Sequence, residues 1–384
     1  MKILMVLDHE FPTDVRVENE ATALIAAGHE VHIACFTQKN RQSQETFKSI
    51  VVHRIEISKL MFKLSVAALT LPFYFRFWFR FLKGLMDIYS FDAIHIHDLP
   101  LAKVGFNISR KYGIKLIIDL HENWPALLRV STHTNTFLGR LLSPNILWVK
   151  YEIRALKYAH YIIVVVDEAK QRIKRLGISE SKIFVVSNTL NKHEFSSAHE
   201  EPDPNFFTLY YAGGINYHRG LQTVISAIAI ARHKVDNLRF RIAGFGSYKQ
   251  QLEQLAHKLN LSDRIEFLGY LPLKEVALNL SKADAALIPH LKTPHTDSTI
   301  PHKLFQYMYI SKPIIASNCA PIERIIHETN SGVIFQSGDA DDLATKIVQL
   351  AKGDIKISPA KHWIEEKYCW ENDAKSLNKV YSAF

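Results

Sequence analysis

The sequence is poor in cysteine, and it contains no apolar run long enough to cross a membrane. Three cysteines occur in 384 residues, Cys35, Cys319 and Cys369, and they lie far apart. This spacing matches neither a disulfide framework nor a zinc-binding pattern, and it favours a reducing compartment. An apolar strand pattern follows directly after Met1-Lys2, so no signal peptide is expected.

A surplus of basic over acidic residues gives the chain a formal net charge of +9. Such a charge suits nucleic acid, an anionic membrane or a phosphorylated ligand as a partner. The basic residues are mostly dispersed along the sequence, which argues against a nucleic-acid partner. Hydrophobic residues make up 47% of the chain, enough for two domain cores at this length.

Apolar runs with polar carboxyl ends alternate with helical patterns in the first half of the chain. The pattern predicts a parallel, doubly wound sheet, whose ligands bind beyond the carboxyl ends of the strands. Those ends carry His97-Asp98, His121-Glu122 and Asn188. The expected strands are residues 2–8, 30–36, 93–98, 115–122, 161–167 and 182–188, with a helix at 17–27.

A polar segment with two prolines, residues 194–205, has the composition of a linker between two domains. Beyond it the alternation of strands and helices starts again, which predicts a second doubly wound domain. We therefore expect an N-terminal domain at residues 1–193, a C-terminal domain at 205–365 and a final helix at 366–384. The expected strands of the second domain are residues 208–214, 239–246, 264–270, 285–290, 313–317 and 331–336.

Two glycine turns follow strands of the second domain. They are Gly213-Gly214 and Gly244 with Gly246, and neither completes a dinucleotide-binding motif. Glycine at such a turn lets the backbone approach a ligand phosphate, although ordinary strand–helix turns also contain glycine. Arg219, shortly after the first turn, is either a partner for a diphosphate or a solvated surface arginine.

The stretch DSTIPHKLFQYM, residues 297–308, has the pattern of a helix that begins near Pro301. The backbone N–H groups of His302 and Lys303 would then be free to bind an anion, and Lys303 would add a positive charge. One helix end alone is weak evidence. Three turns of this kind after strands of one parallel sheet favour a nucleotide diphosphate.

Both halves of the chain resemble glycosyltransferase family 4, whose members are retaining transferases of the GT-B fold. In the second half the resemblance lies in IAGFGSYKQQLEQLA, RIEFLGYLP, ADAALIPH, TIPHKLFQYMYISKPIIASN and GVIFQSGDADDLA. In the first half it lies in DHEFPTDVRVENEATALIAAGHEVHIA, FDAIHIHDLPLAKVG and LIIDLHENWPAL. The resemblance implies an α/β fold of two Rossmann-like domains that face a cleft, with the C-terminal helix packed back on the first domain.

The resemblance also implies a nucleotide-sugar site in the second domain. Two glutamates typical of the family are replaced here, the first by Ser298 and the second by Gln306. Of the family's two cations on the first glycine turn, one position is Gly214 and the other is Arg219, so Lys303 is expected to supply the missing charge. The complete expected donor site is Gly213, Gly214, Arg219, Gly244, Gly246, Leu268, Ser298, Thr299, Pro301, His302, Lys303 and Gln306.

No carboxylate in these motifs stands out as a nucleophile for a covalent glycosyl intermediate. The resemblance implies instead a front-face reaction, in which the departing diphosphate helps to deprotonate the acceptor. Arg219 and Lys303 would hold the leaving group. His121 matches a family histidine near the donor sugar, with a structural core histidine as the alternative. The expected catalytic residues are His121, Arg219 and Lys303, and the acceptor is expected near Asp14, Arg16, His97, Asp98 and Glu122.

Two features could suggest a metal. His95 and His97 alternate on one strand next to Asp98, so these three residues could bind a metal ion. The simpler interpretation is that they are polar residues at a strand end near the acceptor cleft. Residues 339–341 spell a D-x-D sequence, but acidic residues in a first helical turn are expected to be caps. We therefore expect no metal site, and the family resemblance implies no cofactor.

The segment KLMFKLSVAALTLPFYFRFWFRFLKGLM, residues 59–86, is both basic and aromatic. Its apolar run, residues 64–75, is too short for a spanning helix. Arg76, Arg80 and Lys83 recur at helical spacing and form one basic stripe. This pattern predicts a helix that lies on an anionic membrane surface, and the alternative is a buried helix with snorkelling arginines.

Together these features predict a retaining, metal-independent glycosyltransferase that moves a sugar from a UDP- or GDP-type donor. The acceptor is expected to be a glycan or a polyprenyl-linked oligosaccharide in cell-surface polysaccharide biosynthesis. The protein is expected to be cytoplasmic and peripheral, on the inner face of the plasma membrane. The alternatives are a nucleotide-sugar epimerase or a phosphorylase on the same fold, and a non-catalytic binding subunit.

Overall fold

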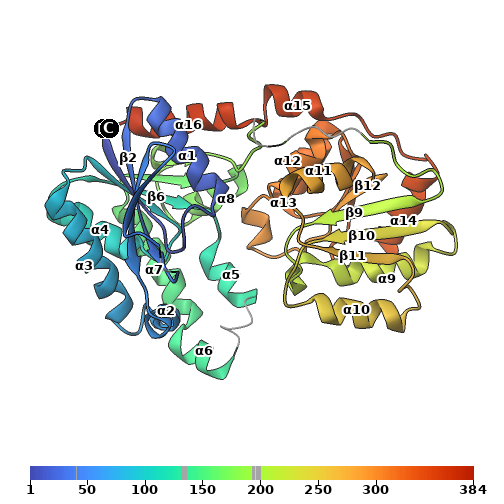
Figure 1. Ribbon diagram of the computed structural model, residues 1–384, viewed down its shortest axis with the longest axis horizontal. Helices are drawn as coiled ribbons and strands as arrows, with labels where there is room; N and C mark the ends of the chain where they lie inside the picture. The colour runs from blue at the N-terminus through green and yellow to red at the C-terminus, as the bar shows by residue number, and fades with distance from the viewer. Residues whose placement is uncertain (40, 131–135, 193–194, 196–199) are drawn as a thin grey trace. The chain divides into compact units, whose positions relative to one another are not determined.

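The computed structural model describes residues 1–39, 41–130, 136–192, 195 and 200–384. The chain divides into two compact units, each built around one sheet with helices packed against it (Figure 1). Unit 1 comprises residues 1–187 and 371–384, and unit 2 comprises residues 188–370. Unit 1 is therefore closed by a segment that follows unit 2 in the sequence.

The sheet of unit 1 has eight strands in the order β3-β4-β2-β1-β5-β6-β7-β8. Neighbouring strands are parallel, except that β3 pairs antiparallel with β4 at the edge. The six strands expected from the sequence are present, and β3 and β4 are additions that the pattern does not predict. The strands are β1 (Lys2–Val6), β2 (Glu30–Thr37), β3 (Gln44–Phe47), β4 (Ile50–Glu56), β5 (Ala93–His97), β6 (Lys115–Leu120), β7 (Tyr161–Val164) and β8 (Ile183–Val185).

The first helix of unit 1 shows how the sequence sets a helix boundary. Asp14 precedes the helix, and its side chain accepts hydrogen bonds from the backbone N–H groups of Arg16 and Val17, at 3.0 and 3.2 Å. Such a cap satisfies donors that lack a partner within the helix. The helices of unit 1 are α1 (Val15–Ala26), α2 (Lys59–Leu64), α3 (Phe73–Ile88), α4 (Ala102–Tyr112), α5 (Trp124–Val130), α6 (Phe137–Leu142), α7 (Asn145–Tyr158), α8 (Asp167–Arg175) and α16 (Trp370–Ser382).

Helix α3 carries the basic and aromatic stretch that stands out in the sequence. Tyr74, Trp78 and Leu82 lie on its buried face, whereas Arg76 and Arg80 are exposed. Several aromatic side chains of α3 therefore pack into the core of unit 1. No helix among the described residues combines the length and the apolar character that spanning a membrane requires.

The sheet of unit 2 has six parallel strands in the order β11-β10-β9-β12-β13-β14, which matches the six strands expected. The strands are β9 (Phe207–Ala212), β10 (Leu238–Ala243), β11 (Ile265–Gly269), β12 (Ala285–Ile288), β13 (Ile314–Ser317) and β14 (Gly332–Phe335). The helices are α9 (Leu221–Ala231), α10 (Lys249–Lys258), α11 (Leu273–Ser281), α12 (Lys303–Tyr309), α13 (Ala320–Thr329), α14 (Ala340–Ala351) and α15 (Lys361–Glu366).

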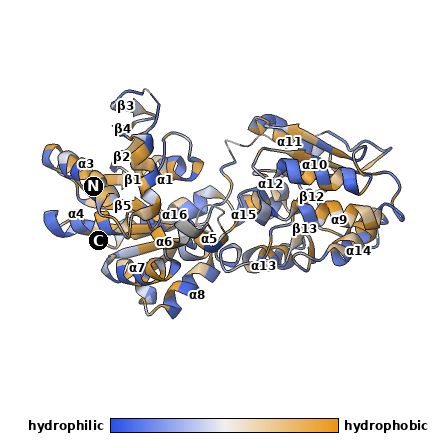
Figure 2. Cartoon of the chain, turned by 90° about the horizontal axis from the view of Figure 1, so that it is seen from below, coloured by the Kyte–Doolittle hydropathy of each residue, from blue (hydrophilic) through white to orange (hydrophobic). Residues whose placement is uncertain are grey.

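The hydrophobic core of each unit lies along its sheet. Figure 2 shows hydrophobic colouring along the central strands β1 and β2 and a hydrophilic side on α10. In unit 2 the core joins strand residues such as Leu209 and Phe240 to Val224 and Ile228 of α9, all fully buried. Burial on both sides explains why the strands are continuous apolar runs, as parallel sheets require.

Candidate active site

Two glycine turns of unit 2 pack backbone against backbone at the carboxyl ends of β9 and β10. Gly213 and Gly244 both have φ near +140°, a conformation that residues with a Cβ rarely adopt. A Cβ on Gly244 would lie 1.9 Å from the carbonyl oxygen of Gly213, and one on Gly246 would lie 2.1 Å from that of Ile215. These glycines are thus required by the packing of the two turns.

Two cations, Arg219 and Lys303, lie beside the first of these turns. The Lys303 Nζ is 3.8 Å from the centroid of the Tyr211 ring, and it lies so close to Gly213 that a Cβ there would be 2.5 Å away. Arg219 Nη1 donates a hydrogen bond of 3.1 Å to Nε2 of His290. The two cations come from separate elements, a short 3-10 turn before α9 and the first residue of α12.

Neither cation is neutralised by a carboxylate of the residues that the structure describes. Within the described part of the chain, Lys303 Nζ and Arg219 Nε are buried without a hydrogen-bond partner, and neither residue forms an ion pair. Burial holds the pKa of Lys303 well below its ordinary value, and the nearby charge of Arg219 lowers it further. Buried cations without partners are costly, so the arrangement favours an anion as a ligand.

The loop before α12 holds the other residues expected to bind the donor. Ser298 is buried, and its Oγ donates to the carbonyl oxygen of Pro294 at 2.8 Å. Gln306 Nε2 donates to Nδ1 of His302 at 3.3 Å, and Nε2 of His302 donates to the carbonyl oxygen of Thr189 at 3.2 Å. The residues Leu268, Thr299 and Pro301 are half-buried.

The D-x-D sequence caps a helix. The Asp339 side chain accepts hydrogen bonds from the backbone N–H groups of Asp341 and Asp342, both at 3.0 Å, at the start of α14. Acidic residues at this end also complement the helix dipole. The capping role predicted from the sequence is confirmed.

A second polar cluster lies inside unit 1 and centres on Asp119 of β6, a residue that no sequence motif singles out. Arg16 of α1 donates to Asp119 through Nε at 3.2 Å and through Nη2 at 3.0 and 3.1 Å. The same guanidinium donates to the carbonyl oxygens of Val186 and Ser187 and pairs with Glu20 at 2.9 Å. Arg16 is thus a buried structural link between α1, β6 and the segment after β8.

His121 lies between two carboxylates in this cluster. Its Nε2 is 2.8 Å from Oδ2 of Asp119, and its Nδ1 is 3.7 Å from Oδ2 of Asp98. Burial by itself would lower the pKa of His121, but Asp119 and Asp98 raise it to about 10. The imidazole is therefore protonated at neutral pH, and it can donate hydrogen bonds or stabilise negative charge.

Two further histidines connect this cluster to the C-terminal helix. His95 and His97 stack with ring centroids 4.4 Å apart, and Nδ1 of His97 is 3.2 Å from Nε2 of His121. Nδ1 of His95 and the hydroxyl of Tyr381, on α16, are 2.8 Å apart. Burial lowers the pKa of His97 to about 4 and holds that of His95 well below its ordinary value, so both are neutral.

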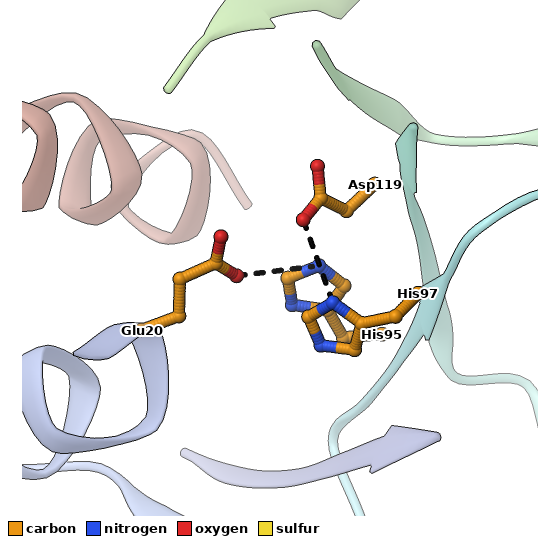
Figure 3. Close-up of side chains that lie close together, drawn as sticks. All are labelled: Glu20, His95, His97 and Asp119. Atoms are coloured by element: carbon orange, nitrogen blue, oxygen red, sulfur yellow. Dashed lines mark ion pairs between the residues drawn. The ribbon is translucent and has the colours of Figure 1, made fainter. Parts of the chain in front are cut away.

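Glu20, His95, His97 and Asp119 could together be considered as metal ligands (Figure 3), since one ligand atom from each lies within 4.8 Å of the others. Neighbouring ligand atoms around a tetrahedral metal lie about 3.4 Å apart, which follows from metal–ligand distances of about 2.1 Å. Here the guanidinium of Arg16 already bridges the two carboxylates. The geometry suits this guanidinium better than a metal ion.

The residues expected to bind the acceptor follow strands of unit 1 or open α1. Asp98 has a left-handed φ of 62°, and its Oδ1 accepts from the backbone N–H of His121 at 3.1 Å. The Asp14 carboxylate caps α1 and contacts Nε2 of His9 at 3.1 Å. Glu122 is half-buried, and His97 is buried. Three of these residues remain partly exposed beyond the carboxyl ends of the strands, namely Asp14, Asp98 and Glu122, whereas Arg16 and His97 are buried.

Sequence comparisons match both units to known families. The profile described as "Glycosyltransferase Family 4" matches residues 14–193, and the one described as "Glycosyl transferases group 1" matches residues 191–370. The chain belongs to glycosyltransferase family 4. The resemblance expected from the motifs is therefore confirmed, and it covers nearly the whole chain.

Individual relatives agree with this membership. An uncharacterised glycosyltransferase of Methanocaldococcus jannaschii is 23% identical over 324 residues, which cover 78% of this chain and 77% of the relative. The amylovoran biosynthesis glycosyltransferase of Erwinia amylovora is 28% identical over 191 residues, 50% of this chain and 47% of the relative. The protein is a glycosyltransferase with relatives in polysaccharide biosynthesis.

Solved structures confirm the GT-B fold. Sucrose-phosphate synthase from Thermosynechococcus elongatus superimposes with a TM-score of 0.80 at 18% identity, covering 100% of this chain and 98% of that one. HepE of Anabaena, solved in complex with UDP, gives a TM-score of 0.73 at 15% identity, with full coverage of both chains. At these identities the likeness concerns the fold.

Proposed function

We propose that this glycosyltransferase takes its sugar from a nucleotide-diphosphate donor of the UDP or GDP type and retains the anomeric configuration. The observation that carries the proposal is the pair Arg219 and Lys303, two cations without a carboxylate partner in the described part of unit 2. Two linked phosphates supply the negative charges and the hydrogen-bond acceptors that this pair of cations lacks. The HepE structures with UDP and UDP-glucose support a donor of this class.

The neighbouring residues suit such a donor. Ser298 and Gln306 are neutral, so they add no negative charge beside the diphosphate. The amide of Gln306 can both donate to and accept from ribose hydroxyls. Because its turn packs tightly against the one at Gly244, Gly213 is held beside Lys303, and the exposed Gly214 gives the phosphates a place to approach the backbone.

In the proposed reaction the bond between the anomeric carbon and the diphosphate oxygen breaks, and the acceptor oxygen forms its bond on the same face of the sugar. The acceptor proton passes to the departing diphosphate. Arg219 and Lys303 stabilise the negative charge on that leaving group, a role that requires no metal ion. His121, held as an imidazolium by Asp119 and Asp98, is proposed to donate a hydrogen bond to the donor sugar.

We propose that the acceptor is a glycan or a polyprenyl-linked oligosaccharide that binds near Asp14, Asp98 and Glu122. Relatives named as an amylovoran biosynthesis glycosyltransferase and a putative colanic acid biosynthesis glycosyltransferase support an acceptor of this kind. An enzyme with such an acceptor works at the cytoplasmic inner face of the plasma membrane as a peripheral protein. Its partner there is an anionic membrane surface and not a nucleic acid.

Calorimetry with UDP, GDP and their sugars tests the donor. Arg219→Ala and Lys303→Ala are each expected to weaken binding of the preferred diphosphate about 10- to 100-fold, the loss of one charge-assisted contact. Lys274→Ala, an exposed lysine of unit 2, is the matched control and is expected to bind normally. Unchanged binding in both site variants would refute the diphosphate site.

Turnover separates the enzyme from a binding subunit. Release of nucleotide diphosphate is expected from one donor, with the product anomer, followed by NMR, the same as that of the donor. Tight nucleotide binding without turnover of any donor in the presence of a membrane glycolipid extract would favour a non-catalytic subunit. Inversion of the anomer would contradict the proposed front-face reaction.

A further inference from the structure

We propose that a pocket between α3, α4 and α7 of unit 1 binds the headgroup phosphate of an anionic phospholipid and attaches the protein to a membrane. The pocket has a volume of about 410 Å³. The inference rests on the proposed function for its membrane setting, and it assigns the attachment to a defined site. The lining includes Phe75, Lys103, Phe106, Lys150, Tyr151 and Arg154.

The walls of the pocket are aromatic. Phe75 of α3 stacks with Tyr151 of α7, with ring centroids 6.2 Å apart, and Phe106 of α4 stacks with Tyr158 of α7 at 4.2 Å. The hydroxyl of Tyr151 accepts from the backbone N–H of Lys103 at 2.8 Å, which ties α7 to the start of α4. These contacts fix the shape of the pocket without a ligand.

The charges of the pocket are all of one sign. Lys103, Lys150 and Arg154 are exposed, and the described residues that line the pocket include no acidic side chain. None of the three cations forms an ion pair within the described part of the chain. Lys103 Nζ lies 5.4 Å from the centroid of the Phe75 ring. Three cations around an aromatic pocket fit an anion that carries an apolar body.

Exposed apolar side chains lie next to this pocket. Leu147 of α7 lines the pocket and is 37% exposed, and its neighbour Ile146 is 60% exposed. Leu71 and Phe73, which precede and open α3, are 36% and 50% exposed. The two segments lie close together, because Thr70 Oγ1, just before Leu71, donates to the carbonyl oxygen of Leu142, four residues before Ile146, at 2.9 Å.

The combination of charges and apolar side chains points to a bilayer rather than to a free anion. A soluble phosphate would use the cations and leave Ile146 and Phe73 in water. At an anionic leaflet the cations meet headgroups while the apolar residues enter the acyl boundary. The basic face of α3 contributes less positive charge to membrane binding than the sequence predicts, because Lys83 forms an ion pair with Asp87 at 2.6 Å.

Vesicle co-sedimentation with the full chain tests the pocket. The wild type is expected to bind vesicles that contain phosphatidylglycerol and to bind pure phosphatidylcholine vesicles poorly. Replacing Lys103, Lys150 and Arg154 together by Gln should weaken binding about a hundredfold, since each basic residue at such a surface contributes roughly fivefold. A control in which Lys258, Lys274 and Lys352 of unit 2 become Gln should change binding less than threefold. Ile146→Ser with Phe73→Ser should also weaken it.

Each contrary outcome has a distinct meaning. Equal loss of binding in the pocket variant and the control would overturn the site, and so would binding to neutral vesicles. Displacement by millimolar inorganic phosphate at constant ionic strength would make the pocket a free-anion site. A concentration-dependent dimer lost in the Ile146 and Phe73 variant would assign the patch to a second copy. Nucleotide binding is measured on the same samples and should be unchanged, so failure of the donor site is detected separately.

Discussion

The guanidinium of Arg16 binds the carboxylate of Asp119 through three hydrogen bonds of 3.2, 3.0 and 3.1 Å inside unit 1. The two residues are 103 positions apart, and both are almost completely buried. Asp119 in turn holds His121, so Arg16 acts on the candidate catalytic histidine through this carboxylate. A residue at the start of the first helix thereby holds the carboxylate that, together with Asp98, raises the pKa of the histidine directly after β6.

Arg16→Ala is expected to destabilise the protein by about 3–5 kcal/mol, because it leaves Asp119 and Glu20 without their cation in the core. Urea denaturation measures the change. Arg80→Ala, which removes an exposed arginine, should stay within about 0.5 kcal/mol of the wild type. A loss below about 1 kcal/mol for Arg16→Ala would contradict the buried link.

The raised pKa of His121 predicts a pH-dependent stability. A group with a folded pKa near 10 and an unfolded pKa near 6.5 stabilises fully below pH 6.5, and this contribution disappears as the pH rises through 10. The wild type should lose about 2 kcal/mol between pH 6.5 and 8 from this group. His121→Gln should be less stable at pH 6 and should lack this part of the pH dependence. Parallel pH profiles of the two proteins would show that His121 is not protonated.

Binding of the donor should raise the pKa of Lys303, with uptake of a proton where the pH lies between the pKa values of the free and the bound protein. In the free protein burial holds the pKa of Lys303 well below its ordinary value, and a bound diphosphate stabilises the charged form. Calorimetry of nucleotide binding in buffers of different ionisation enthalpy measures the uptake, and affinity should fall as the pH rises. Lys303→Met should bind without proton uptake, and its free form should be more stable. Equal uptake in this variant would assign the proton to another group.

Substitutions in the D-x-D sequence, residues 339–341, can distinguish a helix cap from a metal site. Asp339→Ala should cost about 1 kcal/mol in thermal unfolding, because α14 loses its cap. Asp339→Asn should largely restore stability, since asparagine is also a good cap. Transfer activity should remain in both variants and in Asp341→Asn. Loss of activity in the two asparagine variants would instead indicate a metal-binding role.

Much of the fold follows from local sequence patterns. Buried parallel strands are continuous apolar runs, and all twelve expected strands are found within a few residues of their predicted bounds. The added hairpin, β3 with β4, has a weaker signal, because residues 44–46 are polar and no residue of β3 is buried. The β-branched run at Ile50, Val51 and Val52 is the signal that could have revealed β4.

The candidate sites follow less directly from sequence. The motifs point to Arg219 and Lys303, yet only the structure shows that no carboxylate of the described residues accompanies them. The motifs predict that Arg16 binds the acceptor, but in the structure its guanidinium is buried and bound to Asp119, 103 residues further along the chain. The two-residue spacing between Asp119 in β6 and His121 just after it could have indicated their contact. No local pattern links Tyr381 to His95, because that contact depends on how the last helix packs.

This last contact bears on how the protein is made. Leu377 and Val380 of α16 are fully buried in unit 1, and Tyr381 completes the row of histidines that leads to His121. Residues 371–384 emerge from the ribosome only after all of unit 2 has been synthesised. Unit 1 therefore cannot complete its core until the whole of unit 2 has been synthesised. The first half of the sequence thus depends on residues 371–384 for its final packing.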